Sequence, residues 1–138
     1  KKVIVWGHYV HLNKKGKPDS NVSEYVDNLT SLLGKQHSNE MYVAHFLGGV
    51  GKFTNFMNMK EVVIKPPKKT SLGYHLQTNG ITSTFIDAND INLDDKEIKN
   101  MMIRDFSYSG YNSLSKGWKE LWDGIFFIKT ITPVTYKK

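Results

Sequence analysis

The chain contains no cysteine, which excludes disulfides, thiolate nucleophiles and cysteine-ligated zinc together. No apolar run approaches the roughly 18 residues that a membrane-spanning helix needs, so we expect no membrane insertion. No motif has the spacing of a metal or cofactor site, and we expect neither. These absences leave 138 residues, 39% hydrophobic and 23% charged, which we expect to form a single domain over residues 1–138.

Arginine is almost absent, because Arg104 is the only one in the chain. The net charge of +6 therefore comes from lysine, a hydrated point charge less suited than arginine to bidentate contacts with phosphates or bases. This composition favours attraction to a diffuse anionic polymer, such as a cell-wall polymer or RNA, over sequence-specific readout. A basic surface that only keeps the protein soluble is the other interpretation.

The hydrophobic patterning predicts an α+β fold. A β-branched and aromatic run predicts an N-terminal strand over Val3–Leu12. A helix is predicted next, with Asn21 as N-cap and Gly34 as C-cap. A second helix is predicted over Ser38–Leu47, and a third short one with a shared face made of Phe53, Phe56 and Met57.

The second half of the chain reads mainly as strands and two further helices. The predicted elements are a strand over Glu61–Lys65, a central hairpin of Tyr74–Thr78 and Ile81–Ile86 around an Asn79-Gly80 turn, helices beginning at Asn92 and Ser113, and a C-terminal strand over Ile125–Thr132. No repeat or linker divides the chain.

The glycine-rich run Gly48-Gly49-Val50-Gly51-Lys52 resembles a phosphate-binding loop only superficially. That loop needs a glycine five residues before its Gly-Lys pair and a serine or threonine after the lysine. Phe46 and Phe53 occupy those places. We therefore interpret the glycines as a tight connection between two helices.

The histidines supply a second kind of candidate site. His8 and His11 stand three residues apart in a predicted strand, so their side chains should point to opposite faces. A ribonuclease needs two proton-transfer groups and a cation, which His8, His75 and Arg104 would supply if the fold brought them together.

The aromatic residues divide into a predicted core set and a predicted ligand-contacting set. Helical spacing and the following strand assign four residues to the core: Trp118, Trp122, Phe126 and Phe127. Trp6, Tyr108 and Tyr111 are not required by such a pattern, so we consider them candidates for stacking on a ligand.

One longer passage carries a resemblance to a known family. From Asn28 it reads Asn-Leu-Thr-Ser-Leu-Leu-Gly-Lys-Gln-His-Ser-Asn-Glu-Met-Tyr-Val-Ala-His-Phe-Leu-Gly-Gly-Val-Gly-Lys-Phe, with Phe56 and Met57 following. It resembles a segment of lysozyme-like lytic transglycosylases, including those carried in phage virions, in which a helix and a glycine–basic turn precede an Ala-His-Phe-Leu-Gly sequence. The matching positions are Gly34, Lys35, Glu40, Tyr42, Ala44, His45, Phe46, Leu47 and Gly48.

The resemblance makes Glu40 and His45 the candidate catalytic residues and Tyr42 a candidate ligand-binding residue. In that family the catalytic glutamate ends an earlier helix, and neither Glu24 nor Glu40 occupies that place. The family mechanism needs a carboxyl group with a raised pKa, whereas a helix N-terminus favours the ionised form of Glu40. We therefore expect a module with a binding or structural role more than a competent enzyme.

Three functional hypotheses follow. The first is a peptidoglycan-associated module, a virion component among them, acting outside the cell or in the virion. The second is a small basic ribonuclease or toxin domain that uses histidine acid–base chemistry on RNA. The third is a non-catalytic virion or assembly protein with protein partners in a larger assembly, contacted through its β-rich half.

Overall fold

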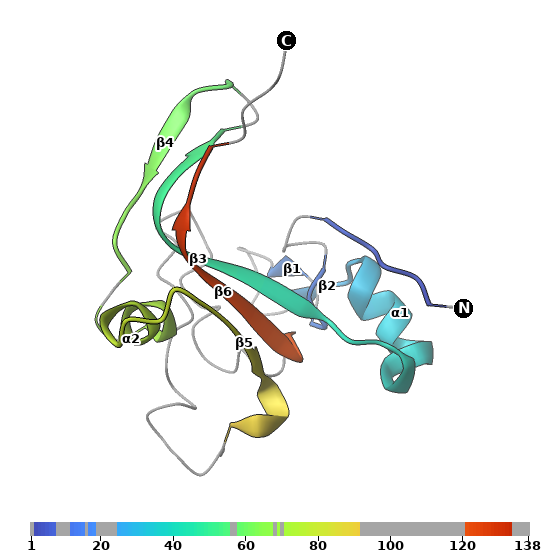
Figure 1. Ribbon diagram of the computed structural model, residues 1–138. Helices are drawn as coiled ribbons and strands as arrows, with labels where there is room; N and C mark the ends of the chain where they lie inside the picture. The colour runs from blue at the N-terminus through green and yellow to red at the C-terminus, as the bar shows by residue number, and fades with distance from the viewer. Residues whose placement is uncertain are drawn as a thin grey trace.

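The structure is a computed structural model that describes residues 2–7, 12–15, 17–18, 25–55, 58–67, 69, 71–91 and 121–133 (Figure 1). The fold class is α+β, as predicted. Within these ranges no helix has the length and apolar character needed to cross a bilayer. The elements are β1 (Lys17–Pro18), β2 (Tyr25–Val26), α1 (Leu29–His37), the 3-10 turn η1 (Ser38–Glu40), β3 (Ala44–Thr54), β4 (Glu61–Ile64), α2 (Leu72–Thr78), β5 (Ser83–Asp87), the 3-10 turn η2 (Ala88–Asp90) and β6 (Gly124–Ile131).

The main sheet has four strands in the order β4-β3-β6-β5. Strands β3 and β6 lie at its centre and run parallel, with Ala44 opposite Gly124 and Gly51 opposite Ile131. The outer strands β4 and β5 are both antiparallel to their neighbours. Strands β1 and β2 form a separate two-stranded ribbon.

The prediction of a helix over Ser38–Leu47 is wrong. Only the turn Ser38–Glu40 is helical, and the chain then enters β3. Alternate residues of this stretch are buried, the two-residue period of a strand. An apolar run this short fits either a helix or a buried strand, and pairing with β6 decides for the strand.

The glycines of this passage lie inside β3 and do not connect two helices. A Cβ atom on Gly49 would lie 2.5 Å from the carbonyl oxygen of Lys129 on β6. Gly51 has a φ of +119°, and a Cβ there would collide with the carbonyl oxygen of Ile131. Glycine is therefore required because the two strand backbones approach closely.

The first helix begins later than predicted. Helix α1 begins at Leu29, where the Asn28 side chain accepts a hydrogen bond from Ser31 N and the Ser31 hydroxyl accepts one from Asn28 N. This reciprocal capping box fixes the start of the helix. Gly34 lies within α1 and does not terminate it. Residues 25–26 form β2, and the predicted N-cap Asn21 lies outside the described residues.

The predicted central hairpin is half correct. Its second strand is present as β5, but its first strand is the helix α2. The hydroxyl of Ser71 caps α2 by accepting a hydrogen bond from Tyr74 N. The Asn79-Gly80 pair ends this helix, with Gly80 at a φ of +77°, so the glycine signal marks a helix end here.

The remaining predictions have mixed outcomes. Strands β4 and β6 confirm the predicted strands at 61–65 and 125–132. Residues 2–7 belong to no strand, so the prediction of an N-terminal strand is wrong there. Phe53 belongs to β3, not to a third helix. Residues 56–57, and the helices predicted from Asn92 and Ser113 as far as residue 120, lie outside the described residues.

The hydrophobic core lies on one face of the sheet. From β3 and β6 this face presents His45, Leu47, Ile125 and Phe127, all buried. Seven buried residues form the core cluster: Val43, Leu47, Ala88, Leu121, Trp122, Ile125 and Phe127. Leu72 and Leu76 of α2 pack against this cluster, so the helix lies on the core side of the sheet.

We expect Phe127→Ala to destabilise the protein by about 3–5 kcal/mol, because it removes a fully buried ring from the core. Phe126→Ala, on the opposite face, should lower the free energy of unfolding by only about 1 kcal/mol, because Phe126 is 38% exposed. Denaturant unfolding of the two variants checks this. Equal losses would contradict the assignment of the core face.

Candidate functional site

Three phenylalanines stand side by side on the face of the sheet opposite the core. Phe46 of β3 lies opposite Phe126 of β6, which lies opposite Phe85 of β5. The ring centroids of Phe46 and Phe126 are 4.9 Å apart and those of Phe126 and Phe85 are 4.5 Å apart. All three side chains are exposed, between 38% and 46%. The register of three strands therefore creates a continuous aromatic surface.

Two further aromatic residues extend this surface at its ends. The ring of Trp6 lies 5.0 Å from that of Phe46, and the ring of Tyr42 lies 6.2 Å from that of Phe85. We call the five residues Trp6, Phe46, Phe126, Phe85 and Tyr42 the aromatic row. Trp6 and Tyr42 are both exposed, and both are candidate ligand-binding residues from the sequence. The fold places them in one row.

The end of the row at Tyr42 is polar. The Tyr42 hydroxyl donates to Asp87 Oδ2 at 2.8 Å and also lies 3.1 Å from the carbonyl oxygen of Asp123. Burial of the hydroxyl, together with the Asp87 carboxylate, raises the pKa of Tyr42 far above its ordinary value. Gly124 makes this arrangement possible, because a Cβ there would lie 2.5 Å from the Tyr42 hydroxyl. The phenol therefore remains a neutral hydrogen-bond donor.

Asp123 holds the polar end together. Its Oδ1 contacts Lys14 Nζ at 2.6 Å and its Oδ2 accepts from Val43 N at 2.9 Å. Its backbone carbonyl accepts from Ala88 N at 2.7 Å. One residue thus joins the loop before β1, the start of β3 and the turn after β5. Because both carboxylate oxygens are engaged, we assign Asp123 a structural role.

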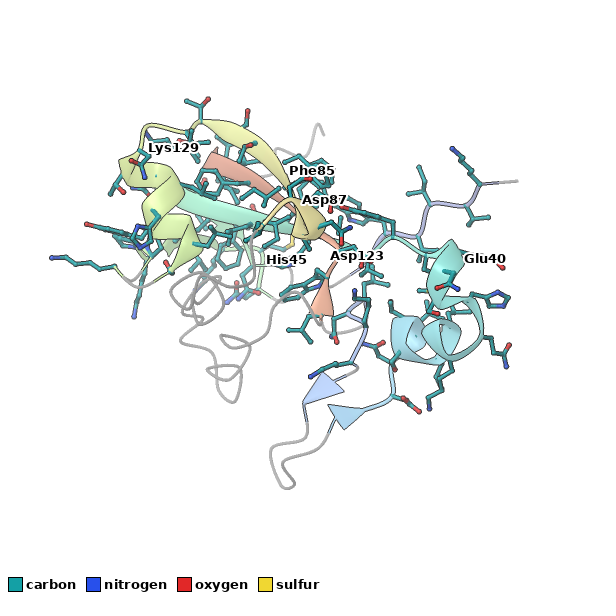
Figure 2. The ribbon with its side chains drawn as sticks, turned by 90° about the horizontal axis from the view of Figure 1, so that it is seen from below. Glu40, His45, Phe85, Asp87, Asp123 and Lys129 are labelled. Carbon is teal, nitrogen blue, oxygen red and sulfur yellow. The ribbon has the colours of Figure 1, made fainter. Side chains whose placement is uncertain are left out.

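The candidate catalytic pair Glu40 and His45 is not brought together. Glu40 lies on η1 with an exposed side chain, 3.7 Å from Nδ1 of His37. His45 is 7% exposed on the core face of β3, with its ring stacked 4.4 Å from that of Trp122. Figure 2 shows Glu40 on the turn beside α1, well apart from His45. The two groups therefore cannot act on one bond in this arrangement.

The other candidate residues are only partly described. His75 lies on α2 with an exposed side chain, and its ring makes an edge contact with Tyr74 at 5.8 Å. Its predicted partners His8 and Arg104 lie outside the described residues, as do Tyr108 and Tyr111. Among the described residues there is no group of three histidine, aspartate or glutamate side chains that could hold a metal ion.

A small cavity lies beside the Trp6 end of the row. It has a volume of about 240 Å³ and is lined by the N-terminal segment, the start of β3 and Trp122. Val5, Trp6 and Leu12 contribute its apolar lining on one side, and Ala44, His45, Phe46 and Trp122 line it from the sheet and core. The cavity therefore adjoins both the exposed row and the buried His45–Trp122 stack.

Sequence reasoning missed the centre of the row. Phe126 is predicted as core, yet adjacent strand residues face opposite sides, so Phe126 and Phe127 cannot both be buried on one face. The alternation of side chains along a strand could therefore have predicted that one of the two phenylalanines is exposed. No local sequence pattern predicts that Phe85 lies beside Phe126, because this depends on the pairing of strands that are distant in the sequence. Asp87 and Asp123 were missed for the same reason.

No protein-family model and no curated protein matches the sequence. Two solved structures resemble the fold. A protein from Bacillus cereus has 17% identity and a TM-score of 0.66, over 96% of this chain and 34% of that protein. A succinoglycan biosynthesis protein has 16% identity and a TM-score of 0.63, over 91% of this chain and 32% of that protein. The chain thus spans about a third of each, and at these identities the likeness concerns the fold alone.

We expect Tyr42 to ionise at a pH above the ordinary tyrosine pKa of 10.0. Its folded-state pKa is raised above the ordinary 10.0, so its hydrogen bonds stabilise the fold fully below pH 10 and lose this effect as the pH rises further. Asp87→Asn should lower the pKa of Tyr42, because it removes the neighbouring negative charge. Ultraviolet titration of tyrosinate checks this, with Tyr42→Phe identifying the signal. Unchanged ionisation in Asp87→Asn would contradict the assignment.

Proposed function

We propose that this chain is a polysaccharide-binding module, with peptidoglycan and related cell-wall glycans as its ligand class, and that the aromatic row is its binding surface. The observation that carries the proposal is the exposed alignment of Phe46, Phe126 and Phe85 across three strands. Sequence resemblance to lysozyme-like transglycosylases suggests the same ligand class, although its helical interpretation of residues 38–47 is wrong.

The chemistry of the row suits a sugar chain. A pyranose ring presents weakly positive C–H groups on its faces, and these are attracted to the negative face of an aromatic ring. The hydroxyl groups around the sugar ring need hydrogen-bonding partners, and the Tyr42 hydroxyl, which donates to Asp87 and keeps its own acceptor capacity, lies at one end of the row. An apolar surface with a few polar groups that fix orientation is the usual composition of a ligand site.

Two further observations support this ligand class. The net charge of +6 favours an acidic polymer, and peptidoglycan bears carboxylates on its peptides. One of the structurally similar proteins is named as a succinoglycan biosynthesis protein.

The proposed role is binding, not catalysis. Glu40 and His45 are far apart, and both oxygens of Asp123 are engaged in structural contacts. No contact among the described residues favours the ribonuclease hypothesis, since His75 is exposed on α2 and its proposed partners are not described.

The main alternative to a glycan ligand is that another protein surface covers the exposed phenylalanines of the row. Strands of a parallel pair are usually covered on both faces, and this chain spans about a third of the structures that it resembles. An apolar segment of a longer polypeptide, or a second copy of the chain, would cover the same phenylalanines. The binding experiment must therefore distinguish glycan binding from coverage of the row by a protein surface.

We expect Phe126→Ala to weaken binding to purified, insoluble peptidoglycan about tenfold, equivalent to about 1.4 kcal/mol, because Phe126 is the central ring of the row. Co-sedimentation across a range of peptidoglycan concentrations gives the affinity. Val63→Ala is the matched control, because Val63 is an exposed apolar residue of β4 outside the row. The difference should persist in high salt, which screens purely electrostatic capture.

Two results would contradict the proposal. The first is wild-type co-sedimentation no greater than that of an unrelated basic protein. The second is equal binding by Phe126→Ala and Val63→Ala. Concentration-dependent self-association of the wild type that Phe126→Ala abolishes, without glycan binding, would identify a second copy as the occupant.

A further inference from the structure

Residues 2–7 form an extended segment without a hydrogen-bonded partner strand. Val3, Ile4 and Val5 are β-branched and Trp6 is aromatic, a composition that favours strands. The segment nevertheless belongs to no strand, and its backbone N–H and carbonyl groups make no hydrogen bond within the described part of the chain. Extended backbone with unpaired polar groups is a template for pairing with another strand. The segment therefore offers an open strand edge.

The side chains around this segment are also uncovered. Val3 is 83% exposed and Ile4 is 93% exposed. Leu29 and Leu33 of α1 line the same groove as these two residues and are exposed as well, whereas the buried residues of this helix are a threonine and a serine. A surface helix normally turns its leucines toward the core. Exposed apolar surface on this scale is typical of an interface.

We propose that a second copy of this chain covers this surface, with residues 2–6 of the two copies paired as antiparallel strands about a twofold axis. The pairs of an antiparallel ladder alternate between hydrogen-bonded and non-hydrogen-bonded types. Adjacent pairs of different type cannot be related by symmetry, so an exact twofold axis requires one residue to lie opposite its own copy. The register must therefore be centred on a single residue.

The sequence favours the register centred on Ile4. In this register Val3 of one copy lies opposite Val5 of the other, and Ile4 lies opposite itself. Lys2 then lies opposite Trp6, where an ammonium group is attracted to the indole face. Cross-strand pairs of β-branched residues stabilise the ladder further. Centring on Val5 would instead place a valine opposite a glycine and separate the lysine from the tryptophan. The segment is thus self-complementary, which favours a second copy over an unrelated strand.

Analytical ultracentrifugation of the whole chain tests the association, in high salt that screens the repulsion between two copies of net charge +6. We expect the wild type to show a concentration-dependent equilibrium between monomer and dimer. Ile4→Asp should weaken dimerisation at least about tenfold, because it places two carboxylates opposite each other in an apolar interface. Since Ile4 is so exposed, this variant should fold like the wild type, which circular dichroism checks.

Two control variants locate the interface. Val63→Asp introduces the same charge at an exposed apolar residue of β4, away from the segment, and should dimerise like the wild type. Phe126→Ala removes the central ring of the aromatic row and should also leave dimerisation unchanged. None of these readouts involves a glycan, so the result is independent of the proposed function.

Single introduced cysteines test the register, because the chain has no cysteine of its own. Oxidation of Ile4→Cys should give a covalent dimer, since facing residues of an antiparallel pair have Cα atoms about 4.5–5.5 Å apart, a distance that a disulfide spans. Val3→Cys and Val5→Cys should each fail to cross-link, because each of these residues lies two positions along the strand from its own copy. A mixture of the two variants should cross-link.

Four outcomes would contradict the proposal. A wild type that stays monomeric at every concentration, with no cross-linking of Ile4→Cys, would overturn it and leave the open edge to a strand of another polypeptide. A dimer that Ile4→Asp retains at full strength would overturn it as well. Cross-linking of Val5→Cys but not of Ile4→Cys would overturn the register. A dimer lost in Phe126→Ala and retained in Ile4→Asp would assign the interface to the row instead.

Discussion

The parallel pairing of β3 with β6 is the constraint on which the rest of the structure depends. It joins residues 44–51 to residues 124–131 and places His45 opposite Ile125 and Phe46 opposite Phe126. Because strand side chains alternate between faces, this register fixes both the buried core and the exposed row. A slip by one residue would exchange Phe126 with Phe127 and destroy both surfaces. The close backbone approach at Gly49 and Gly51 disfavours any bulkier residue that would loosen the pairing.

The polar contacts of Asp123 stabilise the pairing of β3 with β6 where the two strands begin. Asp123 immediately precedes β6, and its contact with Val43 fixes the relative position of the two central strands where they begin, while its ion pair with Lys14 attaches the loop before β1. The hydrogen bond from Tyr42 to Asp87 then attaches β5 to this end of the sheet. The residues that hold the strands together at this end, Tyr42, Asp87 and Asp123, also form the polar end of the row. This explains why polar groups accompany an otherwise aromatic surface.

The sequence was sufficient for the α+β class and for strands with a strong local signal. Strands β4, β5 and β6 follow from β-branched and aromatic runs bounded by glycine or proline. Strand β3 could not be recognised, because Ala44-His45-Phe46-Leu47 fits a helix or a strand and its partner lies some 80 residues further along the chain. Trp6 is predicted as a ligand-contacting aromatic outside the core pattern and Tyr42 as a ligand-binding residue through the family resemblance, but the phenylalanines between them become one surface only through this distant pairing. Local sequence patterns can predict individual residues of the row, whereas their alignment depends on the register between strands that are distant in the sequence.

The central claim is that the face bearing Phe46, Phe126 and Phe85 contacts a glycan, and the most direct measurement follows the aromatic resonances of the phenylalanines during titration with soluble peptidoglycan fragments. We predict that the ring signals of these three residues shift together, while that of Phe127, buried on the opposite face, stays in place. Shifts confined to residues outside the row, for example around His75 on α2, would contradict glycan binding at this face.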